Sequence, residues 1–465
     1  MNTMMNTKRQ NAPDGALLWT NPRNRDRLFR PLAMAGTVVL LSLVSIVLSM
    51  LGACGGNDGD GAVADQPVTI VPAGPNPVSY WNEIASATVN IPAAATGTPE
   101  EQRPNSSADL ATLHVAIYDA VMAIVGTHQP YAIIPPSAAA DASQEAAVGS
   151  AAYRVLLGLF PARTAQYQAA YDTFMAGIAD DPPKAKGITI GAEVAAGILA
   201  LRSNDGRSVV LPTYVPGTGP GQFRGLNPVN RNLPYIKPFA LTSNTQFRAP
   251  GPPALSSAAY AADFNETRSL GSATSATRTA DESILALFGT SPPGPYWQTN
   301  MRTFATTSRS LADQARLMAM VWVAQNDASN ACFESKYFYE RWRRSSAITL
   351  ADTDGNDATD VDTAWVPVVP TPNHPEYPAA HSCVSGAMAE IMTAYYGTPN
   401  ITFDLVGVGP AAGITRHYAS MTAMTADIQL ARITGGMHFR TSTVDGEALG
   451  RHVAQWIVAN KFKTR

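Results

Sequence analysis

The segment SADLATLHVAIYDAVMAIVG (residues 107–126) decides the fold class, because its apolar side chains return with the spacing of a helix. The residues that follow the i, i+3, i+4, i+7 rule most closely are Leu110, Leu113, Val115, Ala116, Tyr118, Val121 and Ile124. Residues 143–160, 164–179 and 187–202 continue this pattern. Since no strand-like alternation is sustained in this half, we expect a series of helices here.

Two long irregular stretches interrupt the helical pattern. Residues 211–255 contain VPGTGPGQFRGLNP and RAPGPPAL, which predict a long structured loop or lid rather than a pair of helices. A second irregular stretch spans residues 350–378. The remaining predicted helices cover residues 256–270, 277–288, 294–307, 309–341, 381–396, 417–434 and 441–460. We therefore expect an all-α fold, a large helical bundle with long loops rich in Pro and Gly.

Size and charge narrow the class of protein. The chain has 465 residues, 45% hydrophobic and 15% charged, which fits one large globular domain or two smaller ones. We expect one domain with an N-terminal helical part at 79–330 and a site-bearing part at 331–465, because no linker separates the halves. The net charge is −3, without a basic stripe interleaved with aromatics, so nucleic acid is not an expected partner.

The N-terminus has the pattern of an export signal. Four arginines between residues 23 and 30 precede an apolar run at 36–51, and LGAC (51–54) follows. A Cys directly after small residues resembles the bacterial lipobox, which implies removal of 1–53 and lipidation of Cys54. The alternative is an uncleaved anchor helix, for which the run is short, since a membrane span needs about 20 residues.

Residues 54–78 are rich in Gly, Asp and Pro and predict a flexible tether. Together with a lipidated Cys54, this predicts an enzyme attached to the cell envelope without spanning a membrane. Gly55 after the Cys favours the periplasmic face of the outer membrane. Cys332 and Cys383 remain in the mature chain, and either a disulfide or two buried thiols fits an exported protein.

The cluster KYFYERWRR (336–344) places Lys336 and Arg343 seven residues apart. On a helix both would project to roughly one side. Such a pair usually belongs to a solvated face. The aromatic side chains between and beside the two cations predict a buried neighbourhood instead, and buried cations need an anionic partner.

A second cluster is HPEYPAAHS (374–382), in which two prolines exclude a helix before His381. His381 then opens an apolar helix, whose free N–H groups and dipole suit an anion. His381 is either a proton carrier for that anion or a simple helix-start residue. The third cluster, ARITGGMHF (431–439), combines Arg432 and His438 with a double Gly that predicts close backbone approach.

Together the three clusters resemble the K-x6-RP, PSGH and SR-x5-H signature of the vanadium haloperoxidase and type 2 phosphatidic acid phosphatase superfamily. Their order and internal spacings match over about 100 residues near the C-terminus. HVAIYDAVMAI (114–124) and PARTAQYQAAYD (161–172) also resemble the bacterial haloperoxidase-like branch. The resemblance implies a helical bundle whose site binds vanadate as cofactor or phosphate as substrate group.

The resemblance also implies a role for each residue that matches the signature. His438 would bond the central atom, as vanadium ligand or as phosphate nucleophile, and His381 would be the general acid and base. Lys336 would in addition assist attack by the halide. The residues that would bind the oxygens are Lys336, Arg343, Arg432 and, through a backbone N–H, Gly436.

Several positions depart from the signature. Arg344 replaces the Pro, and Ala379 and Ala380 replace the Ser and Gly, which removes one hydroxyl from the predicted oxyanion site. The phosphatase branch carries Asp four residues after the last His, where this chain has Ser442, and the next carboxylate is Asp445. An unsupported His is a poorer nucleophile, which favours the haloperoxidase reading.

The leading interpretation is therefore a vanadate-dependent haloperoxidase that oxidises halide with hydrogen peroxide. His374 lies where algal bromoperoxidases have His and the chloroperoxidase branch has an aromatic, which favours bromide; a plain loop His is the alternative. An acid phosphatase acting on phosphoesters and a non-catalytic anchored relative remain as competing functions.

Two further carboxylate patterns are weaker. Asp281 is a candidate for orienting His381. The segment ADTDGNDATDVD (351–362) has acidic residues at alternate positions, but it lacks the Gly and Glu placement of a calcium loop. A solvated acidic turn is the expected structure there.

Overall fold

The computed structural model describes residues 68–69, 76–89, 106–290, 300–301, 304 and 309–465. The predicted signal segment 1–53, most of the predicted tether 54–78 and most of the predicted helix 294–307 lie outside these residues. The fold described below is that of the described residues within 63–465.

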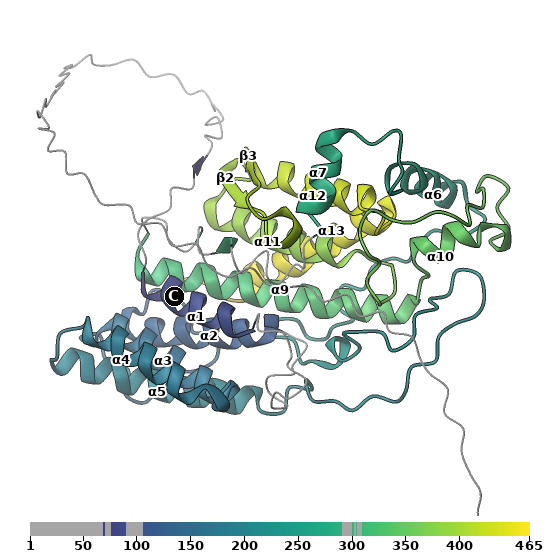
Figure 1. Ribbon diagram of the computed structural model, residues 1–465. Coiled ribbons are helices and arrows are strands. Elements are labelled where there is room, and N and C mark those ends of the chain that lie inside the picture. Colours follow the sequence, from purple (N-terminus) through teal and green to yellow (C-terminus); the bar gives the residue numbers. More distant parts are fainter. Residues whose placement is uncertain (1–67, 70–75, 90–105, 291–299, 302–303, 305–308) are drawn as a thin grey trace, which may run out of the picture. The chain divides into compact units, whose positions relative to one another are not determined.

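The first half of the described chain forms a helical layer, drawn in purple, blue and teal in Figure 1. Its helices are α1 (Pro77–Val89), α2 (Ser106–Val125), α3 (Gln144–Leu159), α4 (Thr164–Ala176) and α5 (Pro182–Arg202). Side-chain caps begin two of them: the Ser143 hydroxyl accepts from the Ala146 N–H at 3.1 Å, and the Asp181 carboxylate accepts from the Lys184 N–H at 3.0 Å. The helices predicted for this half are confirmed.

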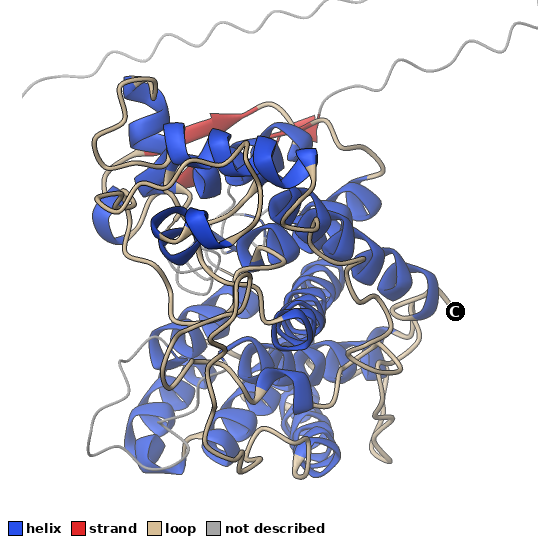
Figure 2. Cartoon of the chain, turned by 90° about the vertical axis from the view of Figure 1, so that its right-hand side faces the viewer, coloured by secondary structure: helices blue, strands red, loops and turns tan. Residues whose placement is uncertain are grey.

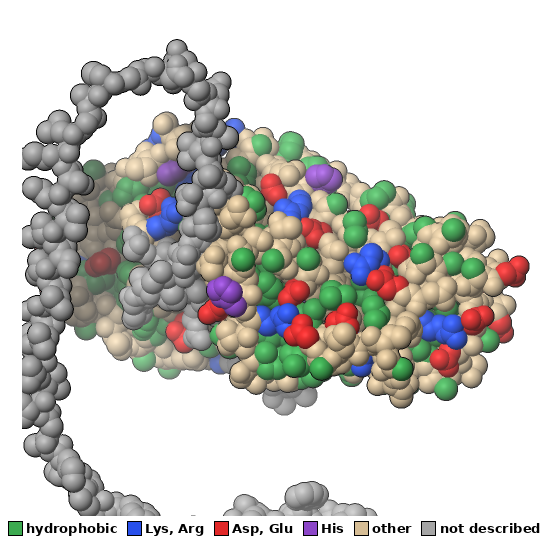
Figure 3. Space-filling view, turned by 90° about the horizontal axis from the view of Figure 1, so that it is seen from above, with side chains coloured by type: hydrophobic (Ala, Val, Ile, Leu, Met, Phe, Trp, Pro, Cys, Tyr) green, Lys and Arg blue, Asp and Glu red, His purple; other side chains and the backbone are tan. Residues whose placement is uncertain are grey.

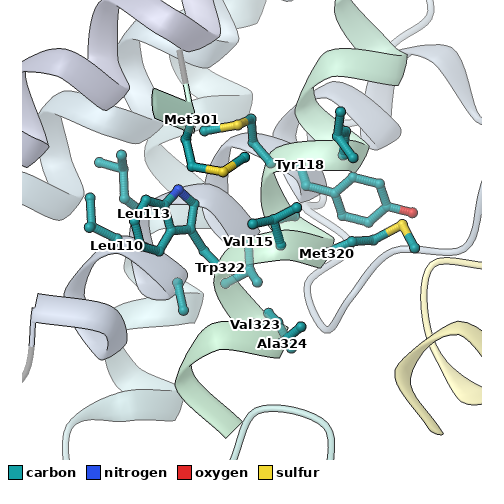
Figure 4. Close-up of a cluster of buried hydrophobic side chains, with 14 of the residues drawn as sticks. Leu110, Leu113, Val115, Tyr118, Met301, Met320, Trp322, Val323 and Ala324 are labelled. Atoms are coloured by element: carbon teal, nitrogen blue, oxygen red, sulfur yellow. The ribbon is translucent and has the colours of Figure 1, made fainter. Parts of the chain in front are cut away.

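The helix α9 (Leu311–Tyr339) lies between this layer and the C-terminal helices (Figure 1). Side chains on all sides of α9 are buried, including Trp322 and Lys336, both with 0% exposure. Figure 4 shows Trp322 and Val323 of α9 packed beside Leu113 and Val115 of α2. Helix α2 is long and apolar enough to cross a membrane, but 89% of it is buried, as expected for a core helix.

The C-terminal part adds a second group of helices and a small sheet. Its α-helices are α6 (Ala258–Leu270), α7 (Ala280–Phe288), α10 (Arg344–Thr349), α11 (Ala380–Tyr396), α12 (Met421–Thr434) and α13 (Arg440–Asn460). The strands are β1 (Val68–Thr69), β2 (Ile401–Val406) and β3 (Thr415–Tyr418), with β1 parallel and β3 antiparallel to β2. Short 3-10 turns are η1 (Pro161–Arg163), η2 (Leu233–Tyr235), η3 (Ala351–Thr353) and η4 (Gly409–Ala411).

The expected all-α fold is thus confirmed, with local differences. The helix predicted for 417–434 begins at Met421, because the Ser420 hydroxyl caps its first turn and residues 415–418 pair with β2. The two-residue strand β1 likewise lies inside the segment predicted as a tether.

Helices α9, α11 and α13 are held close together. A Cβ atom at Gly450 of α13 would lie 2.0 Å from the Cys383 carbonyl of α11, so this crossing requires glycine. A disulfide joins Cys332 of α9 to Cys383, with their Cα atoms 6.3 Å apart. The sequence allowed either a disulfide or two buried thiols, and the structure has the disulfide.

Long loops run over the end of the bundle where α6 and α10 lie (Figure 2). In the acidic segment 351–362, the Asp354 carboxylate accepts from the Asn356 N–H at 2.9 Å and from the Thr359 hydroxyl. No group of three metal-binding side chains occurs among the described residues. The segment forms a turn held by these side-chain hydrogen bonds, and Asp354 at its centre is buried rather than solvated.

Candidate functional site

Four cations gather inside the C-terminal part of the fold. Lys336 lies on the last turn of α9, Arg343 and Arg344 follow that helix, and Arg432 lies on the last turn of α12. Their exposed fractions are only 0%, 3%, 0% and 1%. The surface looks different: Figure 3 shows basic and acidic side chains interspersed on one face. The buried setting predicted for Lys336 and Arg343 is therefore confirmed.

Lys336 anchors the loop that precedes α11. Its ammonium donates to the carbonyls of Pro375 at 3.1 Å and Glu376 at 2.9 Å, and also to that of Pro378. An ammonium has three protons, and these acceptors take all of them. In this structure Lys336 therefore adds positive charge and positions the loop. To form the predicted hydrogen bond to an oxyanion, its ammonium would first have to break one of the three hydrogen bonds to carbonyls.

Arg343 does not share a helix with Lys336, contrary to the prediction from their spacing. Helix α9 ends at Tyr339, because Glu340 adopts a left-handed conformation with φ of 46°. Arg343 is then the residue before α10. Its guanidinium still returns to the cluster, where it donates to the His374 carbonyl at 2.6 Å and the Met437 carbonyl at 3.2 Å.

Arg432 has unused hydrogen-bonding capacity inside the cluster. Its Nε and Nη1 atoms are buried and have no hydrogen-bond partner among the described residues. An unpartnered buried guanidinium is unfavourable, and its planar fork matches a tetrahedral oxyanion. This geometry fits the predicted role of Arg432 in binding oxygens.

His438 is 1% exposed and hydrogen-bonded to a carboxylate that the sequence analysis missed. Its Nδ1 lies 2.9 Å from Oε1 of Glu376. A carboxylate accepts hydrogen bonds, so Nδ1 carries the proton and the Nε2 lone pair is left for a ligand. Burial and the neighbouring cations, first Arg343 and then Lys336, hold the pKa of His438 well below its usual range.

Glu376 also explains the unexpected Arg344. The Nη2 atom of Arg344 lies 2.6 Å from the same Oε1, and its guanidinium lies 3.2 Å above the ring of Phe439. Glu376 stands inside HPEYPAAHS, as the one acidic residue between its prolines. That position is the signal that could have identified it.

His438 is therefore not an unsupported histidine, contrary to the prediction from Ser442. Glu376, 62 residues before His438, supplies a carboxylate in place of an Asp four residues after it. Asp445, the other carboxylate considered, accepts instead from the Tyr377 hydroxyl at 2.6 Å.

His381 lies in the first turn of α11 and is partly buried. It comes three residues after Pro378, whose carbonyl accepts from Lys336, so the backbone before α11 is tied to the cluster. The next residue, Ser382, is 2% exposed, and its hydroxyl has no partner among the described residues. Asp281 is not the partner of His381 proposed above, because it pairs with Arg416 at 3.0 Å and its side chain is 69% exposed.

Gly436 does not present a free donor. Its N–H donates to the Ile433 carbonyl at 2.9 Å, and the Gly435 N–H donates to the Ala431 carbonyl at 2.9 Å. Backbone conformation and close packing, rather than a donor role, explain why glycine is required at Gly436. Gly436 has φ of +73°, and a Cβ there would lie 2.5 Å from the Gly271 carbonyl. Close backbone approach is confirmed, while the predicted oxyanion contact is not supported.

His374 is 8% exposed and lies within the cluster. Arg343 Nη2 is 2.9 Å from its Nδ1 and 3.2 Å from its Nε2, and the ring packs on Phe333 with centroids 5.0 Å apart. Burial, followed by Arg343 and Lys336, places the pKa of His374 well below its usual range. His374 is thus a neutral imidazole that contacts a site cation, rather than a plain loop residue.

The electrostatics of the cluster are unbalanced. Against four buried cations, the described residues place one carboxylate, Glu376, in direct contact. Burial lowers the pKa of Arg343 and of Arg432 to about 9, and mutual repulsion adds to the shift of Arg432. Arginine keeps its charge in proteins, so the lowered pKa values mean that burying these positive charges together is energetically unfavourable. A multiply charged anion would remove that penalty.

A pocket of about 310 Å³ lies along the same end of α9, lined partly by Tyr214, Tyr337 and Phe338. Phe338 was predicted to be buried but is 57% exposed. Tyr337 packs on Phe333 with ring centroids 6.4 Å apart, so one aromatic layer separates this pocket from His374.

Comparisons with known proteins agree with the helical fold. Residues 316–464 match a family model described as the VCPO second helical-bundle domain. A bacterial vanadium-dependent iodoperoxidase structure is similar with 22% identity and a TM-score of 0.67, covering 83% of this chain and 95% of that one. The holo form of a bacterial vanadium-dependent chloroperoxidase has 16% identity, a TM-score of 0.64 and coverages of 83% and 97%. The apo form of a bacterial vanadium-dependent chloroperoxidase has 15% identity and a TM-score of 0.61, covering 80% of this chain and 96% of that one. No curated protein matches the chain.

Proposed function

We propose that the chain is a vanadate-dependent haloperoxidase of the vanadium haloperoxidase and type 2 phosphatidic acid phosphatase superfamily, because residues 316–464 match the VCPO second helical-bundle domain and the fold is similar to that of bacterial vanadium haloperoxidases. It would oxidise halide with hydrogen peroxide. The observation that carries the proposal is the buried cluster of four cations around His438, with one contacting carboxylate. Such a cluster requires an oxyanion for charge balance.

The residues present fit vanadate. Arg432 offers unpartnered Nε and Nη1 donors, and His438 offers Nε2 as a ligand to the central atom. When bound, vanadate supplies a Lewis-acidic centre that activates hydrogen peroxide toward halide. The protein would hold the anion through Arg343 and Arg432, keep Lys336 nearby as a positive charge, and exchange protons through His381.

The test is direct reconstitution. The apoprotein with orthovanadate, peroxide and bromide should brominate a phenolic dye, and His438→Ala should abolish both turnover and vanadium retained after gel filtration. No bromination from acidic to neutral pH, by protein that retains vanadium, would contradict the proposal.

The halide preference is a finer proposal. Bromide is favoured because an imidazole, His374, contacts the site guanidinium of Arg343. Replacing His374 by the aromatic residue of the chloroperoxidase branch, as in His374→Phe, should lower kcat/KM for bromide relative to chloride. Equal effects on iodide, bromide and chloride would assign His374 a structural role instead.

Glu376 favours one alternative, an acid phosphatase acting through a phosphohistidine. A carboxylate on Nδ1 makes Nε2 of His438 a competent nucleophile toward phosphorus. Release of phosphate from an aryl phosphate without vanadate, lost in His438→Ala, would support this alternative over the haloperoxidase. Inhibition of bromination by phosphate, without phosphate release, would support the reverse.

We also propose that the enzyme is a lipoprotein of the cell envelope on the periplasmic face of the outer membrane. The support is the sequence LGAC (51–54) after an apolar run. Metabolic labelling with a fatty acid should mark the wild-type chain and not Cys54→Ala. An unlabelled but membrane-bound wild type would instead favour the uncleaved anchor.

A further inference from the structure

Two hydrogen-bond donors and one cation converge on a single oxygen beside the site. Oε1 of Glu376 lies 2.9 Å from His438 Nδ1, 3.3 Å from the Phe439 N–H and 2.6 Å from Arg344 Nη2. All three side chains of this contact, those of Glu376, His438 and Arg344, are at most 1% exposed. We propose that Arg344 and Glu376 form one positioning unit, which holds the imidazole of His438 with Nδ1 protonated and Nε2 available to the oxyanion.

The hydrogen bonds define both the proton position and the ring orientation. An ionised carboxylate has no proton to donate, so the bond requires an N–H at Nδ1. The Phe439 N–H binds the same oxygen, which ties Glu376 to the backbone directly after His438. The ring therefore cannot turn without breaking a bond shared with its own chain segment. Partners of this kind set the tautomer and direction of a ligating histidine.

Arg344 acts on His438 through Glu376. A carboxylate buried to this extent needs a cation, and Arg344 forms an ion pair with it. Its guanidinium is confined between Glu376 and the ring of Phe439, 3.2 Å away. Arg344 stands where the family signature has Pro, so this departure and Glu376 make sense as a matched pair.

Alternatively, Arg344 binds the anion directly, since its Nε, Nη1 and Nη2 atoms have no hydrogen-bond partner among the described residues and Nη2 has only the ion pair with Glu376. The two readings differ in what they require of Glu376. A positioning residue loses its effect when Glu376 is neutralised, whereas a direct ligand keeps it.

The first experiment measures the tautomer in the apoprotein by nitrogen NMR with labelled histidine, assigning His438 by its absence in His438→Asn. The wild type should show the proton on Nδ1. Glu376→Gln should shift the signal toward a tautomer mixture, because an amide can present either a donor or an acceptor. The matched control is Asp445→Asn, the same change at a half-buried carboxylate that binds Tyr377 instead of His438.

The second experiment measures binding of inorganic phosphate and of orthovanadate by calorimetry. Glu376→Gln should weaken both by about 10- to 100-fold, the usual effect of losing such a partner, and Glu376→Asp should recover part of it. Arg344→Met should weaken binding in the wild type and add little in the Glu376→Gln background.

Retention of the Nδ1 proton and of wild-type affinity in folded Glu376→Gln would overturn the proposal. A full additional loss from Arg344→Met in that background would assign Arg344 to the anion itself and also overturn the unit. The proposal takes only the ligand's identity from the proposed function. A normal tautomer response without any bromination would therefore refute the haloperoxidase and leave the positioning unit standing.

Discussion

At the scale of single residues, the site is defined by charges that the protein does not balance itself. Arg432 is 1% exposed without a partner for Nε and Nη1 among the described residues, and Arg343 and Lys336 are nearly as buried. Buried cations without counterions destabilise a fold. Binding of a negatively charged ligand would therefore remove this destabilisation and add to the stability of the folded protein.

One prediction concerns Arg432→Met. This variant should raise the apoprotein's free energy of unfolding by about 1–3 kcal/mol, because it removes a buried unpaired charge and keeps apolar volume. It should also lose most of the stabilisation that phosphate or vanadate gives the wild type. Urea unfolding without phosphate, and at phosphate concentrations raised in 10-fold steps, measures the stability of the apoprotein and its stabilisation by phosphate. An apoprotein that is less stable than the wild type, with unchanged phosphate stabilisation, would contradict the assignment.

At the scale of elements, helix ends bring the site residues together. Lys336 ends α9, Arg432 ends α12, and His381 begins α11. The 436–438 turn connects α12 to α13, where Gly436 touches Gly271 at the end of α6. Precise backbone contacts at these ends therefore control the positions of the charges.

Gly436→Ala tests this contact. It should lower the free energy of unfolding by about 1–3 kcal/mol or more, because it adds backbone strain and a Cβ 2.5 Å from the Gly271 carbonyl. Gly355→Ala is a matched control, since Gly355 has a similar φ of +72° with nothing within 4 Å of its Cβ. Equal losses in thermal or urea unfolding would show that the contact with Gly271 contributes nothing.

The Cys332–Cys383 disulfide is the second element-scale prediction, because it links the helix of Lys336 to the helix of His381. Replacing both cysteines by serine should lower the free energy of unfolding by about 2–5 kcal/mol. Alkylation of the unreduced, unfolded protein followed by peptide mass mapping should leave both positions unlabelled. Labelling of both would show that they are thiols in solution.

At the scale of the whole molecule, buried neutral imidazoles make the stability depend on pH. Burial lowers the pKa of His114 to about 3, and it lowers those of His374 and His438 in the same direction. A neutral histidine in the fold contributes stability that is present above the unfolded pKa of about 6.5 and is lost as pH falls toward the folded value.

The free energy of unfolding should therefore fall as pH decreases below about 6.5, by up to about 1.4 kcal/mol per pH unit for each buried histidine. His114→Gln, far from the cationic cluster in sequence and on α2, should reduce this slope. Urea unfolding from pH 7 to pH 4 measures it. A slope that stays unchanged in His114→Gln would show that this histidine is protonated in the fold.

Sequence alone determined the helical class, the approximate helix ends and most of the site, because helical periodicity and the three clusters are local patterns. Even the burial of Lys336 followed from its aromatic neighbours. Only the tertiary structure decided which distant residues these side chains contact. Glu376 meets His438 across 62 residues, Lys336 donates to carbonyls of another segment, and Gly436 packs on Gly271. Such pairings depend on how distant segments cross in space, and no spacing within a single segment encodes that.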